Sequence, residues 1–363
     1  MSAARGILLA AGGTGGHLFP AASLAAALAR RGVEVDLATD DRALKYDVDF
    51  PARAVHAIPS ATPTGAGLLS KALAAATLGR GVVAAYALLR RLRPLAVVGF
   101  GGYPTVPPLI AASLLGAPTI LHEQNAVIGR ANKFLAGRVN LIATGFPDLK
   151  GVDAAKLRYV GNPVRPQVLA AAETPYPSFE DGRLRVLVTG GSQGARVMSD
   201  IVPDALALLS ESERCRLSLT QQARGEDRAR VGAAYAKLGL PAEIAEFFPD
   251  LPARIAAAHL IIGRAGASTV SELAVIGRPS ILVPFPHALD QDQAANAAVL
   301  AASGAATVIV QKEFTAERLA GLLRAALAEP ARLQAAALAA KAAGVSDAAE
   351  RLADAAIELA GAG

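Results

Sequence analysis

The sequence has no tryptophan and only one cysteine, and these shortages narrow the classes of protein to which it can belong. With Cys215 alone, the chain has neither a disulfide framework nor the ligand spacing of a zinc finger, and it suits a reducing compartment. Aromatic residues make up only 4% of the chain, which argues against a platform for stacking single-stranded bases. The net charge of +5 comes without a long run of Lys and Arg, so we expect no nucleic-acid partner.

We also expect no membrane-spanning segment in the longest uncharged run of the chain. No secretory signal peptide is expected, because a glycine-rich turn follows the first apolar residues at once. The longest uncharged run, residues 95–121, is long enough to span a bilayer. It contains four prolines and four glycines, and these breakers predict a strand, a loop, a helix and a second strand instead.

What the chain does contain is one pattern that occurs twice: a short apolar strand, a glycine-rich turn and a helix. The three elements are predicted at residues 7–11, 12–16 and 20–30 in the first half, and at 186–189, 190–194 and 195–209 in the second. Pro203 marks a point where the later helix is expected to break or restart. In a chain of 363 residues, this repetition predicts two similar α/β domains in tandem.

Other short apolar segments alternate with helical stretches in both halves. They predict strands at residues 33–38, 96–100, 119–121 and 141–143, and at 216–219, 260–263, 280–283 and 306–310. Alternating strands and helices imply parallel sheets with helices on both faces. Ligands of such sheets bind at the carboxyl ends of the strands, which is where the glycine-rich turns lie.

We expect the boundary between the domains near residues 161–166, ahead of a polar segment at 173–183. From about Glu317 onward the sequence is rich in alanine and helical. Periodicity alone does not show on which domain the last helix packs.

Two glycine loops in the first half are candidates for anion binding. Residues 12–17 and 100–105 each follow a predicted strand and precede a helix, whose N-terminal amides suit a phosphate. Tight turns without a ligand are the alternative explanation of the same glycines. A nicotinamide dinucleotide site with Asp40 as the ribose reader is a further alternative, but Leu18 stands where the fingerprint needs its third glycine.

Two residues beside these loops are candidates for acid–base chemistry. His17 stands where the first loop enters its helix, and it suits a general base, a hydrogen-bond donor to substrate or a brace for the loop. Glu123 lies in the polar run 122–125 after the strand at 119–121, where it suits a base, a hydroxyl binder or a cap for the loop. The residues alone leave these roles open.

The second half repeats the phosphate-loop logic at residues 190–195 and 263–273. Glu272, early in the second of these helices, suits either the two hydroxyls of a ribose or a helix cap. A polar stretch at 284–296 again indicates the ligand edge of the sheet. Asp-x-Asp pairs, a pattern that binds metal in some enzymes, occur at 47–49 and 290–292. Neither directly follows an apolar strand, so we expect no metal site.

The stretch from Leu68 to Arg93 combines apolar residues with five basic ones. Such a surface suits anionic lipid headgroups. More often, however, a helix of this composition packs its apolar face into the core.

Seven motifs, in this order, resemble the MurG family of GT-B glycosyltransferases. They are GGTGGH (12–17), FGGYPT (100–105), LHEQN (121–125), GNPVR (161–165), GGSQGA (190–195), GRAGASTVSE (263–272) and PFPH…Q…N (284–296). The motifs span about four fifths of the chain and are specific as a set. The resemblance implies an α/β fold of two Rossmann-like domains with parallel sheets facing a cleft. Residues 1–162, joined by a C-terminal helix at about 342–363, would bind the acceptor and the membrane, and 163–341 would bind UDP-GlcNAc.

The resemblance implies transfer of GlcNAc from UDP-GlcNAc to the MurNAc 4-hydroxyl of undecaprenyl-diphosphate-MurNAc-pentapeptide (lipid I), with inversion. The product would be lipid II, for peptidoglycan and cell-wall synthesis, cell shape and cell division. No cofactor is implied. The enzyme would be a peripheral protein on the cytoplasmic face of the inner membrane, in contact with its anionic surface. Cell-wall synthesis and division proteins would be its partners.

Site residues are carried over by matching motif. The donor would be bordered or contacted by Thr14, Gly15, Gly16, Asn125 and Arg165 in the first domain. In the second it would be held by Ser192, Phe248, Ala267, Ser268, Thr269, Val270, Ser271, Glu272 and Gln293. Of these, Glu272 would take the ribose, the backbone near Phe248 the uracil, and Gln293 the sugar hydroxyls. Gly13, Gly101, Gly102 and Tyr103 would grip the acceptor diphosphate. His17, ahead of Glu123, would be the catalytic base.

The sequence departs from the family pattern in two places. Residues 220–223 read TQQA where the family has His-Gln-Ser/Thr-Gly, and Gln291 competes with Gln293 for the sugar contact. Both departures affect donor contacts and leave the reaction type unchanged. A UDP-GlcNAc 2-epimerase or another UDP-sugar glycosyltransferase is the alternative enzyme. A nucleotide-sugar sensor or scaffold at the membrane is the alternative without catalysis.

Overall fold

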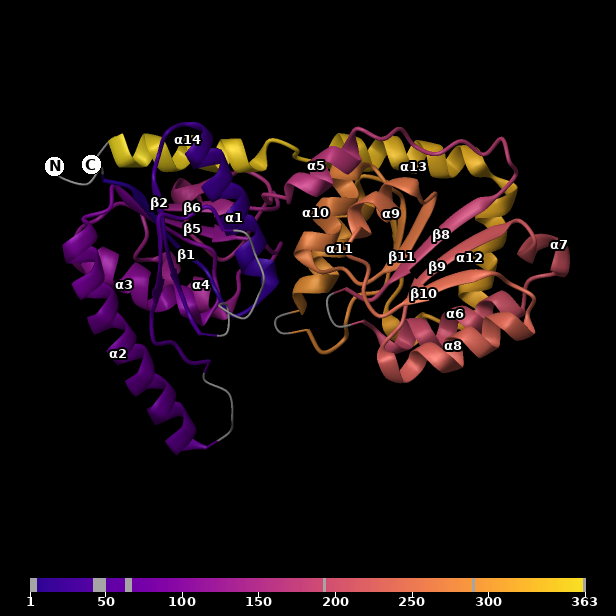
Figure 1. Cartoon of the computed structure of the whole chain (residues 1–363), viewed down its shortest axis with the longest axis horizontal. Coiled ribbons are helices and arrows are strands. Elements are labelled where there is room, and N and C mark those ends of the chain that lie inside the picture. The colour runs from indigo at the N-terminus through magenta and orange to yellow at the C-terminus, as the bar shows by residue number, and fades with distance from the viewer. Residues whose placement is uncertain (1–4, 42–49, 63–66, 192–193, 289–290, 362–363) are drawn as a thin grey trace. The chain divides into compact units, whose positions relative to one another are not determined.

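The computed structural model describes residues 5–41, 50–62, 67–191, 194–288 and 291–361. The chain divides into two compact units. The first unit comprises residues 1–165 and 346–363, and the second comprises 166–345. Each unit is a parallel β-sheet covered by helices, so the predicted fold class is confirmed (Figure 1).

In the first unit, the described residues form a sheet of seven strands in the order β3-β2-β1-β4-β5-β6-β7. The strands are β1 (Ile7–Ala10), β2 (Val35–Thr39), β3 (Ala54–Ala57), β4 (Ala96–Gly99), β5 (Thr119–Glu123), β6 (Leu141–Thr144) and β7 (Leu157–Tyr159). Every pairing is parallel, and β1 pairs with both β2 and β4 in register from Ile7 to Ala10. The order of the strands therefore reverses between β1 and β4.

Helices cover both faces of this sheet. They are α1 (Gly15–Arg30), α2 (Leu68–Leu92), α3 (Val106–Leu114), α4 (Arg130–Ala136) and α14 (Ala348–Gly361). Ile7 and Leu9 of β1 pack with α1 and α14, while Leu8 and Ala10 pack with α2, α3 and α4. Successive side chains of a strand point to opposite faces, so both faces are buried and the strand is apolar throughout.

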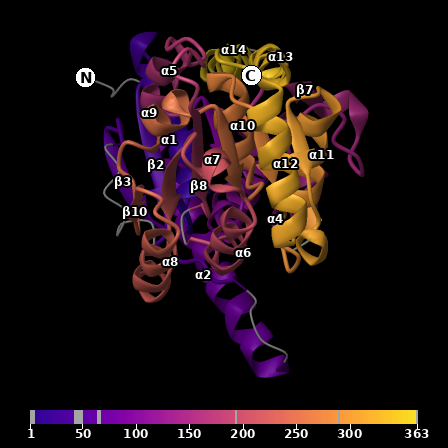
Figure 2. The same cartoon turned by 90° about the vertical axis from the view of Figure 1, so that its right-hand side faces the viewer.

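The second unit repeats the arrangement with strands in the order β10-β9-β8-β11-β12-β13, all parallel. The strands are β8 (Leu184–Thr189), β9 (Leu217–Gln222), β10 (Ala242–Ala245), β11 (Leu260–Gly263), β12 (Ser280–Leu282) and β13 (Ala306–Val308). The helices are α5 (Pro166–Ala172), α6 (Arg196–Ala207), α7 (Glu211–Arg214), α8 (Gly225–Lys237), α9 (Leu251–Ala257), α10 (Ala267–Ile276), α11 (Asp292–Ala302), α12 (Ala316–Ala328) and α13 (Pro330–Ala343). One core joins β8 to α6, α8 and α12, which lie together in Figure 2.

Several predicted boundaries need correction. Helix α1 begins at Gly15, five residues before the predicted start at Pro20, because the glycine turn ends earlier. Strand β5 continues to Glu123, so His122 and Glu123 belong to the strand and do not follow it. Helix α6 runs through Pro203 without a break. The carbonyl of Ser199, which proline cannot pair, accepts a hydrogen bond from Nη1 of Arg230 at 3.2 Å.

A buried arginine connects elements of the second unit. Arg278 is 2% exposed, and its guanidinium donates to the carbonyls of Ala256, Ile276, Gly277, Thr174 and Pro175 at 2.6–3.1 Å. It thereby satisfies the C-terminal carbonyls of α9 and α10 and fixes the segment that follows α5. All of these hydrogen bonds go to backbone oxygens, and the guanidinium also lies 5.5 Å from the centroid of the Tyr176 ring.

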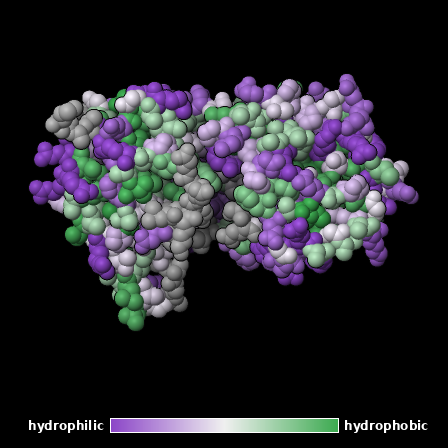
Figure 3. All heavy atoms as spheres, viewed as in Figure 1, coloured by the Kyte–Doolittle hydropathy of each residue, from purple (hydrophilic) through white to green (hydrophobic). Residues whose placement is uncertain are grey.

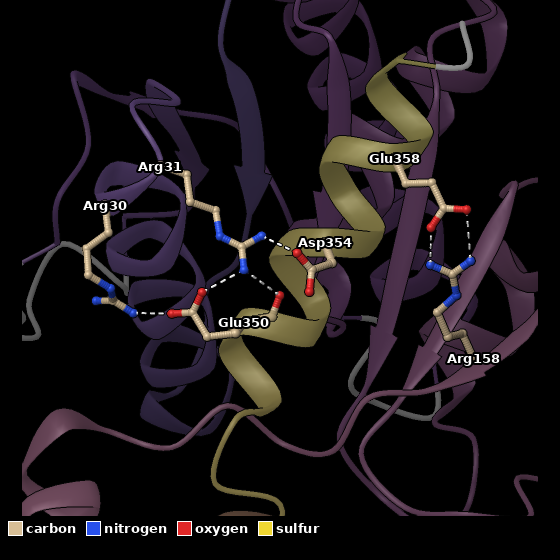
Figure 4. Close-up of polar contacts among 6 residues, drawn as sticks. All are labelled: Arg30, Arg31, Arg158, Glu350, Asp354 and Glu358. Atoms are coloured by element: carbon tan, nitrogen blue, oxygen red, sulfur yellow. Dashed lines mark hydrogen bonds and ion pairs between the residues drawn. The ribbon is translucent and has the colours of Figure 1, made fainter.

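The last helix, α14, completes the first unit. Leu352, Ala353, Ala355 and Ala356 are buried against α1 and the sheet. Ion pairs flank this apolar stripe (Figure 4). Arg30 and Arg31 pair with Glu350 at 2.5 and 2.7 Å, Arg31 also pairs with Asp354 at 2.5 Å, and Arg158 pairs with Glu358 at 2.7 Å.

We expect the apolar stripe of α14, and not its ion pairs, to stabilise the first unit. Leu352→Ala should lower the free energy of unfolding of this unit by about 2–5 kcal/mol, because it leaves a cavity in the core. Arg158→Ala is the matched control and should cost less than about 1 kcal/mol, because its ion pair with Glu358 is solvent-exposed. Hydrogen exchange of the β1 amides in urea would measure both. Equal losses in the two variants would contradict the expectation.

Candidate functional site

Each sheet has one point where the order of its strands reverses, between β1 and β4 in the first unit and between β8 and β11 in the second. The loops that leave the carboxyl ends of two such strands diverge to opposite sides of the sheet, and the crevice between them is the usual ligand position. All of the predicted glycine loops follow one of these four strands.

The loop after β1 is built to leave helix amides open. Gly13 adopts a positive φ of 79°, and its amide donates to Oδ1 of Asp40 at 3.0 Å. Thr14 precedes α1 without a side-chain cap, and the first turn of the helix has no acidic residue. Thr14 and Gly16 are exposed. The helix N-terminus therefore carries a partial positive charge at the surface, which suits an anion.

Asp40 has a structural role in this loop. It is buried, and a Cβ added to Gly12 would lie 2.7 Å from its Oδ1. The carboxylate therefore supports the glycine turn from beneath, which is a different task from binding a ribose. The contact gives the dinucleotide interpretation no support.

The loop after β4 meets the first loop at His17. Gly101 and Gly102 adopt positive φ values of 87° and 71°, which a side chain would disfavour. The hydroxyl of Thr105 donates to the carbonyl of Gly101 at 2.7 Å and fixes the turn, and Tyr103 follows in a short 3₁₀ helix. A Cβ added to Gly102 would lie 3.2 Å from Nε2 of His17. His17 thus stands between the two predicted acceptor loops.

Glu123 is buried at the carboxyl end of β5 and accepts four hydrogen bonds. Its Oε1 accepts from the backbone and side-chain nitrogens of Asn125 at 2.9 and 3.3 Å. Its Oε2 accepts from the amide of Gly129 at 3.0 Å and from Nδ2 of Asn132 at 2.7 Å. Of the roles that the sequence left open for Glu123, these contacts support the loop cap.

His17 hydrogen-bonds to a residue to which the sequence gave no role. Its Nδ1 lies 3.1 Å from Oε1 of Gln124, whose Nε2 donates to the Phe100 carbonyl at 2.8 Å. Burial lowers the pKa of His17, against the opposing effect of the Glu123 charge and the Gln124 hydrogen bond. Burial also lowers the pKa of His122, which lies on β5 two residues before Gln124, to about 4. Its membership of the polar run 122–125 was the signal that could have identified Gln124.

Two further predicted donor contacts of the first unit, Arg165 and Gly15, lie beside or on α1. The guanidinium of Arg165 lies 5.1 Å from the centroid of the Phe19 ring on α1. Asn162 donates from Nδ2 to the carbonyl of Gln124 at 2.9 Å, which connects the GNPVR segment to the end of β5. Gly15 begins α1, one residue after the exposed Thr14.

In the second unit, α10 presents its N-terminus directly after β11. Gly266 caps it in an extended conformation, and the first turn has no acidic residue. Ala267, Ser268, Thr269 and Ser271 are partly exposed, whereas Val270 and Glu272 are buried. The amide of Val270 donates to the Gly266 carbonyl. The open amides thus precede Val270, in the part of the turn where a diphosphate was predicted.

The loop after β8 is held by Gln222. Its Oε1 accepts from the Thr189 hydroxyl and the Gly190 amide, both at 3.0 Å, and its Nε2 donates to the carbonyls of Gly191 and Glu246 at 3.0 Å. Gln222 lies within residues 220–223, where TQQA departs from the family pattern. The hydrogen bonds of its side chain to the loop therefore come from a position at which this sequence differs from the family. Ser192, predicted to hold the diphosphate, lies outside the described residues.

Two other predicted donor residues have contacts that fix local loops. Oε1 of Gln293 accepts from the amides of Ala265 and Phe285 at 3.3 and 3.0 Å. Phe248 is buried, and the guanidinium of Arg254 lies 4.3 Å from its ring centroid. Gln291 is exposed and has a positive φ of 54° just before α11.

Of the Asp-x-Asp pairs, Asp47, Asp49 and Asp290 lie outside the described residues. Within the described ranges, no three His, Cys, Asp or Glu side chains are grouped in a way that could hold a metal ion.

Comparisons with known proteins agree in both halves of the chain. The glycosyltransferase family 28 N-terminal domain matches residues 7–144, and the family 28 C-terminal domain matches residues 185–352. The chain is 59% identical over 359 residues to a protein of Methylobacterium sp. (strain 4-46), covering 98% of this chain and 96% of that one. That protein is named UDP-N-acetylglucosamine–N-acetylmuramyl-(pentapeptide) pyrophosphoryl-undecaprenol N-acetylglucosamine transferase.

Among solved structures, the chain is similar to MurG of Acinetobacter baumannii, with a TM-score of 0.80 at 28% identity. The match covers 98% of this chain and 99% of that one. A UDP-GlcNAc 2-epimerase of Neisseria meningitidis, bound to UDP-GlcNAc, matches with a TM-score of 0.67 at 12% identity, over 97% and 100% of the two chains. The second likeness shows a shared fold only.

Proposed function

The chain belongs to the family of UDP-N-acetylglucosamine–N-acetylmuramyl-(pentapeptide) pyrophosphoryl-undecaprenol N-acetylglucosamine transferases, and from this membership we infer its activity. It is a glycosyltransferase that moves GlcNAc from UDP-GlcNAc to lipid I and so forms lipid II, a precursor of peptidoglycan. The identity of 59% along nearly the whole chain is the observation that carries this conclusion.

For the donor, we propose a site on the second unit. The open N-terminus of α10 would hold the diphosphate through its amides and through Ser268 and Thr269. Glu272 would accept from the ribose hydroxyls, and the backbone near Phe248 would meet the uracil. Gln293 uses its Oε1 on two loop amides, so it would offer Nε2 to a sugar hydroxyl.

For the acceptor, we propose the two glycine loops of the first unit. Gly13 and the N-terminus of α1 form one side of this site, and Gly101, Gly102 and Tyr103 form the other. Backbone amides in such loops can approach a diphosphate closely, because no Cβ intervenes. A Cβ added to Gly102 would lie 3.2 Å from Nε2 of His17, and this proximity supports an imidazole at the same site.

The mechanism we propose is a single displacement with inversion. The acceptor hydroxyl oxygen forms a bond to the anomeric carbon, while the bond from that carbon to the β-phosphate oxygen breaks and UDP leaves with the electron pair. Nε2 of His17 takes the hydroxyl proton. The lowered pKa of His17 supports this role, because a base must be neutral before it can accept a proton.

Transfer to a lipid is the direct test. Purified protein is incubated with radiolabelled UDP-GlcNAc and a short-chain lipid I analogue, with and without a chelator. We expect label in the lipid fraction in both cases. Loss of transfer with chelator alone would contradict the proposed absence of a metal. Conversion of UDP-GlcNAc without labelled lipid would contradict the transferase and favour an epimerase.

Replacing the proposed base should slow the chemical step. His17→Ala should lower kcat by about 10²–10⁴-fold, because the proton then has no acceptor of suitable pKa. His56→Ala is the control: His56 lies in the same unit on β3 and hydrogen-bonds to Asp36, away from the glycine loops. It should leave kcat within about twofold of the wild type, as expected for a site remote from the chemistry. A loss below about tenfold in His17→Ala would contradict the role.

We further propose that the enzyme attaches peripherally to the cytoplasmic face of the membrane through the first half of α2. Leu69 and Leu73 are 74% and 61% exposed, and Lys71 and Arg80 are exposed on the same segment. Residues 50–122 contain six Lys and Arg and no Asp or Glu. In Figure 3 the end of α2 that projects from the first unit is hydrophobic. An apolar, basic surface suits anionic headgroups.

Charge reversal should weaken this attachment. Lys71→Glu with Arg80→Glu should lower the affinity for phosphatidylglycerol vesicles by at least about tenfold, at roughly 1 kcal/mol for each basic residue. Co-sedimentation at low and high salt measures the effect. Leu338→Ser is the control. It alters a leucine on α13 that is about as exposed as Leu69, and this variant should bind as the wild type does. Unchanged binding of the double variant would exclude α2 as the attachment site.

A further inference from the structure

A chain of hydrogen bonds connects His17 to two backbone carbonyls through Gln124 and His122. Oε1 of Gln124 lies 3.1 Å from Nδ1 of His17, and Nε2 of Gln124 lies 3.0 Å from Nδ1 of His122. The same Nε2 lies 2.8 Å from the carbonyl oxygen of Phe100. Nε2 of His122 lies 3.1 Å from the carbonyl oxygen of Gly161. The chain thus begins at the loop after β4 and ends at the GNPVR segment.

The Phe100 carbonyl decides the orientation of the Gln124 amide. A carbonyl oxygen can only accept, so the nitrogen of the amide must face it at 2.8 Å. The reverse orientation would place two carbonyl oxygens against each other inside the protein. Oε1 of Gln124 therefore faces His17 and must accept from it.

The Gly161 carbonyl sets the same direction from the other end. Nε2 of His122 must carry hydrogen in order to donate to Gly161, so its Nδ1 is left to accept from Gln124. A protonated His122 would turn a second donor toward the amide nitrogen. The lowered pKa of His122, about 4, keeps the ring neutral at physiological pH and preserves the chain.

We propose that Gln124 is a positioning residue that selects the tautomer of His17, with hydrogen on Nδ1 and the lone pair on Nε2. Nε2 is the nitrogen that a Cβ on Gly102 would approach to 3.2 Å, in the proposed acceptor site. The proton of the attacking hydroxyl passes to Nε2, and the imidazolium keeps its Nδ1 hydrogen on Gln124. The proposal rests on the role of His17 as the base.

The titratable groups that act on His17 are Glu123 and His122, both on β5. Because His122 stays neutral, the negative charge of Glu123 is the one that favours a protonated His17. Gln124 itself is uncharged, so it acts on His17 through the direction and the length of the hydrogen bond between them. Replacing it by a carboxylate would add a charge without removing the acceptor.

The test measures the tautomer of His17 separately from the activity of the enzyme. In ¹⁵N-histidine-labelled enzyme, long-range ¹H–¹⁵N correlations distinguish a protonated from a bare ring nitrogen. The wild type should show His17 with hydrogen on Nδ1. In Gln124→Met we expect a mixture of tautomers and a kcat lower by about 10–100-fold, with the KM for UDP-GlcNAc changed less than about threefold.

Gln124→Glu keeps an acceptor toward His17 and should keep the wild-type tautomer. It should also raise the pKa of His17, so the acidic limb of the kcat profile moves to higher pH. Asn140→Ala is the matched control: its side chain also binds β5, at the Thr119 end of the strand. It should change neither tautomer nor kcat.

Hydrogen on Nε2 of His17 in the wild type, or an unchanged tautomer in Gln124→Met, would overturn the proposal. The first of these results is measured in the wild type, so it does not depend on whether a variant folds. A changed tautomer with kcat within twofold would overturn its catalytic consequence. In that case an unimpaired His17→Ala would show that the base role is at fault, whereas an impaired one would show that the tautomer does not limit turnover.

Discussion

Side-chain amides hold the loops at the carboxyl ends of both sheets by bonding to their backbone groups. Gln124 does so after β4 and Gln222 after β8, while Gln293 joins the loops at Ala265 and Phe285. A glycine-rich loop has backbone groups that no adjacent strand can satisfy, and it has few side chains of its own. One amide supplies both a donor and an acceptor. The loops are thereby fixed while the helix N-termini beside them stay open to anions.

The central strands could be predicted because burial on both faces leaves a mark in the sequence. β1, β4, β8 and β11 are short, largely apolar strands that end at a glycine or within two residues of one, and the prediction located each of them within two residues. β3, β7 and β10 were missed. All three lie at the edge of a sheet and are partly exposed, so they lack the continuous apolar run that marks a buried parallel strand.

The types of residue in the site could also be predicted, since polar side chains directly after a buried parallel strand are typical of the ligand edge of a sheet. Their pairings could not. His17 and Gln124 are 107 positions apart, and the proton position on His17 follows from the carbonyl of Phe100, on a third segment. The extent of β5 favours the loop-cap role for Glu123, because the last residue of a strand can accept hydrogen bonds from the loop that follows it.

Helix α14 gives the first unit a discontinuous sequence, since residues 166–345 of the second unit are inserted before it. A ribosome makes the chain from the N-terminus, so the second unit is complete while the first still lacks Leu352 and its buried neighbours. Domains that are contiguous can fold as they emerge. Here the synthesis of the first unit starts first and ends last. The faces of α1 and the sheet that α14 covers stay exposed until residues 348–361 have been made.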